Sequence, residues 1–488
     1  MNAPATPVGV RHLVEAFVDP GTFVEIDALV EHDCRHFGAE RRTVPGDGLV
    51  VGHARVEGRP VVLYAHDPSF LGGSSSRMHA LKIAKVLDLA LKVGVPVLAL
   101  NHSSGIRIHE GVDAGVQFGE VFFKTVKASG VVPQISLILG DCAGGAAYTP
   151  ALTDFIVMVE NASTLFLTGP AVIRKATGEE VTKEQIGGAA LHTARTGLAH
   201  FVVPSVEDAL ELARDLLSFL PQNNAVEVPP GPPGDAGPRP VPRLRDLIPT
   251  APSVPYNVFD VIAELADGGQ FLEVARTFAP NIVTGFCRLG GRSAGIVANQ
   301  PSRLAGCLDV DSSEKAARFI RFCDAFGLPI VTLLDVPGYL PGLQQETGGI
   351  IVSGAKLMHA YCEATVPKLA VVLRKAYGGA HPTLANRWAT DLIYALPEAE
   401  IAIMGPGAAV DVIFRRQVAE AEVPEARKLE LAEDYRAAHA SAAYSARRGY
   451  IEGIVAHEDV RNTLIASLSI LRDKIAGPPR RKHSNIQL

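Results

Sequence analysis

The chain has 488 residues, of which 47% are hydrophobic and 20% are charged, and its formal net charge at pH 7 is −6. This composition is typical of a globular protein of two to four domains and gives no reason to expect a nucleic-acid partner. The six cysteines have no C-x-x-C spacing, which argues against a zinc ribbon or a disulfide framework and favours a cytoplasmic protein. Neither a signal peptide nor an apolar run of about 18 residues is visible, so we expect no membrane span.

The first half of the chain predicts alternating helices and strands. Apolar residues at helical spacing predict a helix over 78–94, after which VPVLALN predicts a short buried strand. A helix is then expected around 113–129, followed by a strand over 133–140, a Gly-Gly turn and a helix from about Tyr148. This alternation indicates an α/β fold with mostly parallel strands.

A proline-rich stretch separates this half from a second one. Residues 221–255 contain eleven prolines, and because proline fixes φ and lacks an N–H, we expect an extended linker here. The linker divides an N-terminal domain over 1–220 from a C-terminal domain over 256–488. In the second domain we expect a helix over 312–327, a strand at PIVTLLD, a helix near 351–364 and a strand over 367–375. The final stretch, residues 415–476, should be helical and wrap a domain or a neighbouring subunit.

The two halves carry the same glycine turn at matching positions. Gly144-Gly145-Ala146 recurs 234 residues later as Gly378-Gly379-Ala380, and other segments recur near that offset, so we predict two homologous domains. A strand that ends in Gly-Gly-Ala before a helix presents unpaired N–H groups, which stabilise negative charge. The alternative is that these glycines only permit a tight turn or close packing. Duplication of the turn favours a pair of anion-binding sites.

A second glycine cluster follows a strand in each half. Gly72-Gly73-Ser74 has its counterpart at Ala305-Gly306-Cys307, and two glycine turns that converge from different strands are what an oxyanion hole requires. No phosphate-binding loop and no G-x-G-x-x-G pattern occurs, which argues against ATP or dinucleotide binding.

Side-chain catalysts are not evident. The chain has neither a G-x-S-x-G elbow nor H-E-x-x-H spacing, and Asp154, Asp309 and Asp335 are better explained as helix caps or salt-bridge partners. We therefore expect catalysis by backbone electrostatics, with no metal in this chain and a cofactor brought from outside.

Several longer segments are more specific. In chain order they include PGDGLVVG, FLGGSSSRMHALKI, ASGVVPQISLILGDCAGGAAYTPALTDF, DVPGYLPGLQQETGGIIVSGAKLMHAYCEATVPK and RKAYGGA. In this order they resemble the carboxyltransferase (β) subunits of biotin-dependent acyl-CoA carboxylases, most closely the propionyl-CoA carboxylase type. The resemblance implies two tandem crotonase-like domains of the spiral ββα type, in a homohexamer whose active sites each lie between two subunits.

The resemblance also implies a reaction. Carboxybiotin on a separate carrier protein releases CO2, the freed biotin N1 takes the α-proton of a short or medium acyl-CoA, and the resulting enolate attacks the CO2. Two anions develop, on the thioester and on the biotin ureido oxygen, and the repeat supplies a hole for each. The chain has no A-M-K-M biotinylation sequence and no ATP-grasp signature, so it should need a biotin carboxylase and a biotin carboxyl carrier (α subunit) as partners.

The resemblance assigns roles to individual residues. Gly144 and Gly145 would serve the thioester, and Gly379 and Ala380 would serve biotin. The acyl-CoA side would further include Gly72, Gly73, Ser74, Gly105, Ile106 and Ala143. The biotin side and substrate choice would involve Gly306, Gly338, Tyr339, Tyr377, His381 and Pro382.

Three places depart from the family pattern. Residues 101–111 read NHSSGIRIHEG where N-D-S-G-G-A-R-I-Q-E-G is common, and Asp141 stands where proline is usual. His381 and Pro382 replace the usual Tyr-Asp of the propionyl type, which removes a charge and an N–H after the second turn. We therefore expect an acyl group other than propionyl, or a broader range of acyl groups.

Three other functions compete with this interpretation. The α subunit of a biotin-dependent decarboxylase in a membrane sodium pump shares these segments and runs the reaction backwards. A biotin-independent crotonase-type hydratase or hydrolase would place a carboxylate beside the hole, and no clear candidate follows Gly145. The last alternative is a non-catalytic scaffold within a carboxylase assembly.

Overall fold

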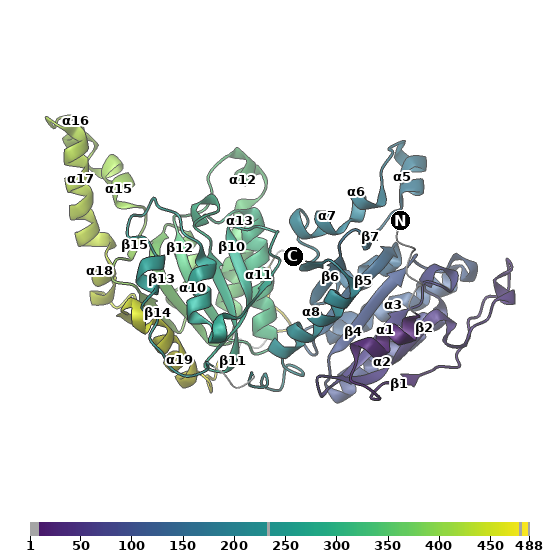
Figure 1. The fold of residues 1–488 in the computed structure, drawn as a ribbon. Helices are drawn as coiled ribbons and strands as arrows, with labels where there is room; N and C mark the ends of the chain where they lie inside the picture. Colours follow the sequence, from purple (N-terminus) through teal and green to yellow (C-terminus); the bar gives the residue numbers. More distant parts are fainter. Residues whose placement is uncertain (1–8, 232–234, 478–480, 487–488) are drawn as a thin grey trace, which may run out of the picture. The chain divides into compact units, whose positions relative to one another are not determined.

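The computed structural model describes residues 9–231, 235–477 and 481–486. The chain divides into two compact units, Met1–Pro229 (unit 1) and Pro230–Leu488 (unit 2), each built around its own sheet (Figure 1). The division falls within the proline-rich stretch.

Unit 1 contains an eight-stranded sheet in the order β1-β2-β3-β4-β5-β6-β8, with β7 paired to β5. The pairs β1–β2 and β2–β3 are antiparallel and the remaining pairs are parallel. The strands are Val24–Ile26 (β1), Leu49–Val56 (β2), Arg59–His66 (β3), Val97–Ser103 (β4), Gln134–Ala143 (β5), Phe155–Val159 (β6), Thr164–Phe166 (β7) and Phe201–Val203 (β8).

The helices of unit 1 are Val10–Phe17 (α1), Arg77–Val93 (α2), Val112–Ala128 (α3), Gly145–Ala151 (α4), Pro170–Thr177 (α5), Lys183–Gly187 (α6), Ala189–Ala194 (α7) and Val206–Phe219 (α8). α2 and α3 pack on the sheet, whereas α5 has no buried residue. Ile83 of α2 and Phe118 of α3 join Tyr64 and Val97 of the strands in one buried core. On α8, Arg214 donates hydrogen bonds to the carbonyl oxygens at the end of α1, so these two helices lie side by side.

Unit 2 repeats the topology, with strand order β16-β14-β13-β12-β11-β10-β9 and β15 paired to β13. β9, β10 and β11 pair antiparallel and the rest pair parallel. β10 begins 233 residues after β2, and β11 begins 233 residues after β3. The strands are Phe271–Val274 (β9), Ile282–Leu289 (β10), Arg292–Asn299 (β11), Ile330–Val336 (β12), Lys368–Tyr377 (β13), Leu392–Ala395 (β14), Glu400–Ala402 (β15) and Gly453–Ile454 (β16).

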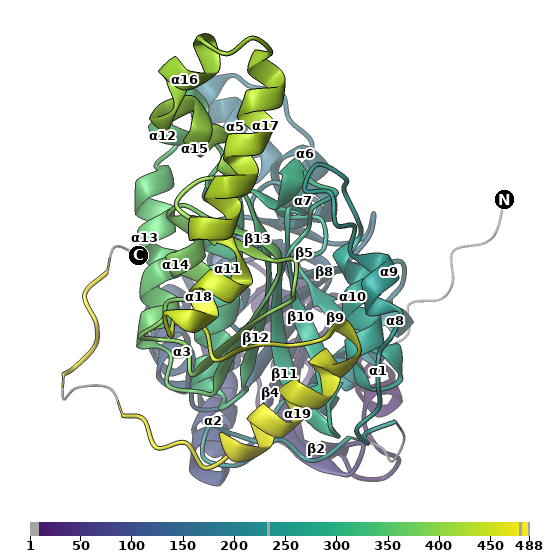
Figure 2. The same ribbon diagram turned by 90° about the vertical axis from the view of Figure 1, so that its left-hand side faces the viewer.

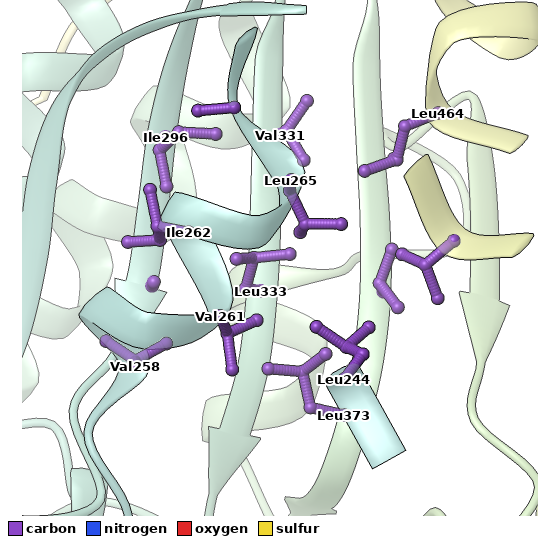
Figure 3. Close-up of a cluster of buried hydrophobic side chains, with 14 of the residues drawn as sticks. Leu244, Val258, Val261, Ile262, Leu265, Ile296, Val331, Leu333, Leu373 and Leu464 are labelled. Carbon is purple, nitrogen blue, oxygen red and sulfur yellow. The ribbon is translucent and has the colours of Figure 1, made fainter. Parts of the chain in front are cut away.

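The two faces of the unit 2 sheet are covered by different helices. α10 and α19 pack on one face, where Ile262 and Leu464 meet Val331 and Leu373 (Figure 3). On the other face, α11 lies so close to β11 that a Cβ at Gly295 would be 2.6 Å from Cys323 Sγ. The helices are Leu244–Leu247 (α9), Val258–Leu265 (α10), Val310–Ala325 (α11), Leu343–Thr347 (α12), Ile350–Glu363 (α13), Ala380–Leu384 (α14), Pro406–Ile413 (α15), Arg415–Ala419 (α16), Pro424–Tyr435 (α17), Ala442–Arg447 (α18) and Val460–Ile470 (α19).

The predicted helices and strands around the two glycine turns are confirmed. α2, β4, α3 and β5 in unit 1, and α11, β12, α13 and β13 in unit 2, lie within a few residues of their predicted bounds. The prediction for the helix after the first turn is wrong in its start: α4 begins at Gly145 and not near Tyr148. The reason is that the chain turns at Gly144 alone and enters the helix at the next residue.

The expectation of an extended linker over 221–255 is wrong for its second part. α9 lies within it, and Val241 and Leu244 are fully buried in the core of unit 2. Arg374 Nη1 donates to the carbonyl oxygens of Ala251 (2.9 Å) and Val254 (2.8 Å). Apolar side chains between the prolines, and buried donors for the carbonyl groups, attach this segment to unit 2.

The C-terminal part is helical as predicted, with two additions. A π-helical turn, Arg436–Ala440 (η7), follows α17, and the short strand β16 pairs with β14 at the edge of the sheet. α16 and α17 extend beyond the end of the sheet in both views (Figures 1 and 2), whereas α19 packs in the core of unit 2. Of the helices formed by described residues, none is long and apolar enough to cross a bilayer.

Candidate functional site: a glycine turn with free N–H groups in each unit

In unit 1, three segments that follow neighbouring strands converge. The turn after β3, Leu71–Gly73 (η3), is joined to the segment after β4 because Ser104 N–H donates to Gly72 O at 3.0 Å. At Gly73, an added Cβ would collide with the carbonyl oxygen of His102. The segment after β4 also lies against the end of β5, since a Cβ at Gly105 would be 3.0 Å from Ala143 O. The predicted acyl-CoA-side residues are therefore brought together.

The turn between β5 and α4 is shaped by Gly144. Its φ of +58° and ψ of −132° form a conformation that residues with a side chain rarely adopt. Its N–H donates to Phe166 O of β7 at 2.9 Å, and the predicted role of Gly144 toward the thioester stays a prediction. Within residues 9–231, the N–H groups of Gly145 and Ala146 have no acceptor, as the first turn of a helix leaves them.

Unit 2 has the same turn in the same conformation. Gly378 has φ +60° and donates its N–H to Ala402 O of β15 at 3.0 Å. In the described part of unit 2, no acceptor faces the N–H groups of Gly379 and Ala380, where α14 begins. The free pair in unit 2 therefore consists of the two residues predicted, and it corresponds to Gly145 and Ala146 at the 234-residue offset.

Tyr339 lies beside the second turn. Its ring is 4.0 Å from the point where a Cβ on Gly379 would be. Its hydroxyl donates to Thr383 Oγ1 at 3.2 Å, and that hydroxyl donates to Gly379 O at 2.8 Å. Burial raises the pKa of Tyr339, so the side chain is a neutral phenol held against the turn.

The other predicted glycines of unit 2 belong to the same cluster. Gly338 O accepts a hydrogen bond from Leu308 N–H at 3.1 Å, next to the Gly306 turn. A Cβ at Gly306 would be 2.5 Å from Asp335 O, at the end of β12. The segments after β11, β12 and β13 thus converge as their counterparts do in unit 1.

Tyr377 has a structural position, just before the turn. Its hydroxyl donates to the carboxylate of Glu400 on β15, which also accepts from Arg436 Nε at 2.6 Å. Burial, reinforced by the charge of Glu400, raises the pKa of Tyr377. Tyr377 therefore ties the turn to β15 and to the π-helical turn after α17, and it keeps its proton.

His381 and Pro382 occupy the first turn of α14. His381 is half-buried, and burial lowers its pKa to about 4, so its imidazole is neutral at physiological pH. Pro382 is exposed, at a helix position whose N–H would have no intrahelical acceptor in any case. Within unit 2, the pyrrolidine ring therefore faces outward, and its effect on substrate choice stays a prediction.

Sequence reasoning missed the buried ion pair that supports the unit 1 site. Arg107 Nη1 lies 2.7 Å from Asp47 Oδ1, and both side chains are fully buried. Arg107 also donates to Ser74 O (2.9 Å) and to Ser74 Oγ (3.2 Å). Asp47 lies in PGDGLVVG, 60 residues before Arg107, and nothing in the local sequence pairs the two. A buried pair of this kind fixes geometry, because either charge left alone would be strongly destabilising.

Asp309 and Asp335 have the structural roles that the sequence predicts. Asp309 caps α11 by accepting Ser312 N–H at 2.9 Å. Asp335 is buried and accepts from Arg374 Nε at 2.9 Å. Among the His, Cys, Asp and Glu side chains of described residues, no group of three or more could hold a metal ion. What each unit offers a ligand is thus a pair of fixed backbone donors, which suits an oxygen that becomes negatively charged.

Comparison with known proteins identifies the family of the chain. The carboxyl transferase domain family matches residues 9–486. The propionyl-CoA carboxylase carboxyltransferase subunit of Haloferax mediterranei is 49% identical, over 98% of this chain and 93% of that protein. The methylmalonyl-CoA decarboxylase α subunit of Veillonella parvula is 46% identical, over 98% of this chain and 92% of that protein.

A solved structure extends the match to three dimensions. The transcarboxylase 12S hexamer with hydrolysed methylmalonyl-coenzyme A bound aligns with a TM-score of 0.94 at 45% identity, covering 98% of this chain and 93% of that one. The predicted fold of two tandem crotonase-like domains is confirmed. The chain belongs to the carboxyl transferase family and is a carboxyltransferase of the propionyl-CoA carboxylase and transcarboxylase type.

Proposed function

We propose that this chain is the carboxyltransferase subunit of a biotin-dependent acyl-CoA carboxylase. It moves a carboxyl group from carboxybiotin, held on a separate carrier, to the α-carbon of a short or medium acyl-CoA. The observation that carries the proposal is the duplicated turn. In each copy the N–H of the first glycine, Gly144 or Gly378, donates a hydrogen bond to a neighbouring strand, and the next two N–H groups stay free. One such pair suits each of the two oxygens that gain charge.

On the acyl-CoA side, Gly145 and Ala146 would donate to the thioester oxygen. Loss of the α-proton turns this oxygen into an enolate, and each fixed donor stabilises such an anion by about 3 kcal/mol. The ion pair of Arg107 with Asp47 would hold the surrounding segments in place while charge develops. Because the donors are backbone groups fixed by β5 and α4, they need no reorganisation during the reaction.

On the biotin side, Gly379 and Ala380 would hold the ureido oxygen. Carboxybiotin, when bound, supplies the carboxyl group and then the base that removes the α-proton. The neutral His381 adds no positive charge to this turn, and Tyr339 offers a flat ring beside it. The residues present therefore fit a planar group with one oxygen that becomes negative.

Partners form part of the same proposal. A biotin carboxylase and a biotin carboxyl carrier would load and deliver the carboxyl group, and a cytoplasmic location stays a prediction. A homohexameric core is supported by the hexamer of the transcarboxylase 12S relative. It is also supported by α3, where Val112, Val116 and Phe123 are 75%, 72% and 61% exposed. An apolar stripe of this kind marks a surface that another chain covers.

A second candidate is the reverse reaction, carried out by the α subunit of a decarboxylase. The 46% identity to a methylmalonyl-CoA decarboxylase subunit favours it, and the same two turns would serve both directions. The direction would then depend on the partners and not on the residues described above. A biotin-independent crotonase-type enzyme and a non-catalytic scaffold have no such support.

The deciding experiment measures acyl-CoA-dependent fixation of labelled bicarbonate. The purified chain is tested alone, with a biotin carboxylase and ATP, and with both plus a biotinylated carrier. We expect fixation only in the complete mixture. Transfer of the carboxyl group from a malonyl-type CoA to the carrier, without net fixation, would instead support the decarboxylase. Fixation that does not need the carrier would overturn the proposal.

A further inference from the structure

Ile106 covers the glycine turn of unit 1. Its Cγ1 and Cδ1 atoms lie 2.9 Å and 3.2 Å from the point where a Cβ on Gly145 would be. Ile106 therefore borders the turn that carries the free N–H of Gly145. Among the residues that the structure describes, no other side chain lies within 4 Å of that point.

The position of Ile106 is fixed from both sides along the chain. Gly105 O accepts Ser75 N–H at 2.8 Å, and Arg107 N–H donates to Ser75 O at 2.8 Å. The side chain of Arg107 is itself held by the buried Asp47. Ile106 also packs against the core that contains Ile83, and a β-branched side chain has few rotamers. The wall it forms is therefore rigid.

The equivalent position in unit 2 has a different side chain. There Tyr339 follows Gly338 as Ile106 follows Gly105, and its ring lies 4.0 Å from the Cβ point of Gly379. The two turns share their backbone donors but differ in the side chain beside them, which is a branched aliphatic group in unit 1 and an aromatic ring in unit 2. An aliphatic side chain beside one turn and an aromatic ring beside the other would suit two different reactants, the acyl-CoA and biotin.

We infer that Ile106 sets the length of acyl group that the enzyme accepts. This rests on the proposed function, in which Gly145 holds the thioester oxygen. The first carbons of the acyl chain then contact Cγ1 and Cδ1 of Ile106, and each further methylene is pressed against a wall that does not yield. Ile106 is thus a specificity-determining residue of the acyl-CoA side.

The test compares the wild type with Ile106→Ala and Ile106→Val. We expect Ile106→Ala to raise kcat/KM for butyryl-CoA relative to propionyl-CoA by about fourfold, and again by about fourfold for each further buried methylene. Ile106→Val, which loses only Cδ1, should show a smaller rise in the same direction. The KM for the carboxylated carrier reports on the biotin side and should change much less.

The matched control is Ile83→Val, which removes the same methyl group from the same core but away from the turn. It should leave the ratio of kcat/KM values unchanged, and thermal unfolding confirms that each variant is folded. An unchanged ratio of kcat/KM values in folded Ile106→Ala overturns the inference.

Dissociation constants of propionyl-CoA and hexanoyl-CoA, measured by calorimetry, give a readout without turnover. If no acyl-CoA is carboxylated, the proposed function fails, and the ratio of these constants still tests Ile106.

Discussion

Lys82 and Lys315 perform the same structural task in the two units. Lys82 Nζ donates to Gly46 O at 2.9 Å and to Leu49 O, at the start of β2. Lys315 Nζ donates to Phe278 O and Ile282 O, both at 2.8 Å, at the start of β10. Both side chains are buried, and burial lowers the pKa of each to about 8. Lys82 ties α2, the helix after the Leu71–Gly73 turn, to β2. Lys315 ties α11, the helix after the corresponding Leu304–Gly306 turn, to β10.

Removal of either ammonium group should destabilise its own unit. Lys82→Met or Lys315→Met leaves buried carbonyl oxygens without a donor, which costs about 1–3 kcal/mol of unfolding free energy. Hydrogen exchange read out by peptide should locate the loss in unit 1 for Lys82→Met and in unit 2 for Lys315→Met. Lys85→Met, at an exposed lysine paired with Asp27, is the control and should change stability by less than about 0.5 kcal/mol. Equal effects of all three variants would contradict this assignment.

The two glycine turns should differ in their tolerance of a methyl group. Gly145→Ala places a Cβ 2.9 Å from Ile106, whereas the nearest atom at Gly379 is 4.0 Å away. Overpacking of this kind costs about 1–3 kcal/mol, so chemical denaturation should show a loss for Gly145→Ala and little change for Gly379→Ala. The double variant Gly145→Ala/Ile106→Ala should recover part of the loss. A double variant that is less stable than the sum of its parts would argue against a clash with Ile106.

Substrate preference should respond to Pro382. An apolar residue here favours added methylenes by roughly 0.8 kcal/mol for each one fully buried, so within the length limit that Ile106 sets we expect the wild type to discriminate less against butyryl-CoA than a Pro382→Asp variant does. Pro382→Asp should shift kcat/KM back toward propionyl-CoA. The measurement is kcat/KM across acetyl-, propionyl-, butyryl- and branched acyl-CoAs. A wild type that clearly favours propionyl-CoA, with a profile that Pro382→Asp leaves unmoved, would show that this position does not select the acyl group.

Acid should weaken the fold partly through His381. Its pKa is about 4 in the folded chain and about 6.5 when unfolded. Between these values the unfolded state binds the extra proton, so the stability due to this residue is complete above pH 6.5 and is lost as the pH falls toward 4. His381→Gln should therefore lose less thermal stability than the wild type between pH 7 and pH 4.5. His12→Gln, at an exposed position of α1, is a control that should follow the wild type.

The regular elements near the site could be predicted because their signals are local. Apolar spacing over 78–94 determines the buried face of α2, and the short apolar run after it lies in the middle of the sheet as β4. The recurrence of Gly-Gly-Ala likewise marked both turns. These features depend on residues close together in the chain, which a sequence pattern contains.

Features that depend on distant partners could not be predicted. The N–H of Gly144 is used because β7 brings Phe166 O beside it, and no local rule places a strand of three residues there. The same holds for Arg107 and Asp47, which lie 60 residues apart in the chain and are brought together by the packing of β2, α2 and β4. Val241 was misjudged for the opposite reason: the prolines around it dominate the local signal, although its own side chain is fully buried.

The attachment of residues 241–255 to unit 2 has a consequence for how the chain can be divided. Asp335 is one buried carboxylate beside two cations, Arg374 and Lys375, and both cations also donate hydrogen bonds to carbonyl oxygens of the segment 249–254. A polypeptide that began at residue 256 would expose those cations and open the core beside α10. The C-terminal copy of the repeat therefore needs the preceding segment 241–255 in order to fold. An exchange of C-terminal halves between related enzymes must carry the proline-rich segment from the same parent as the sheet it caps.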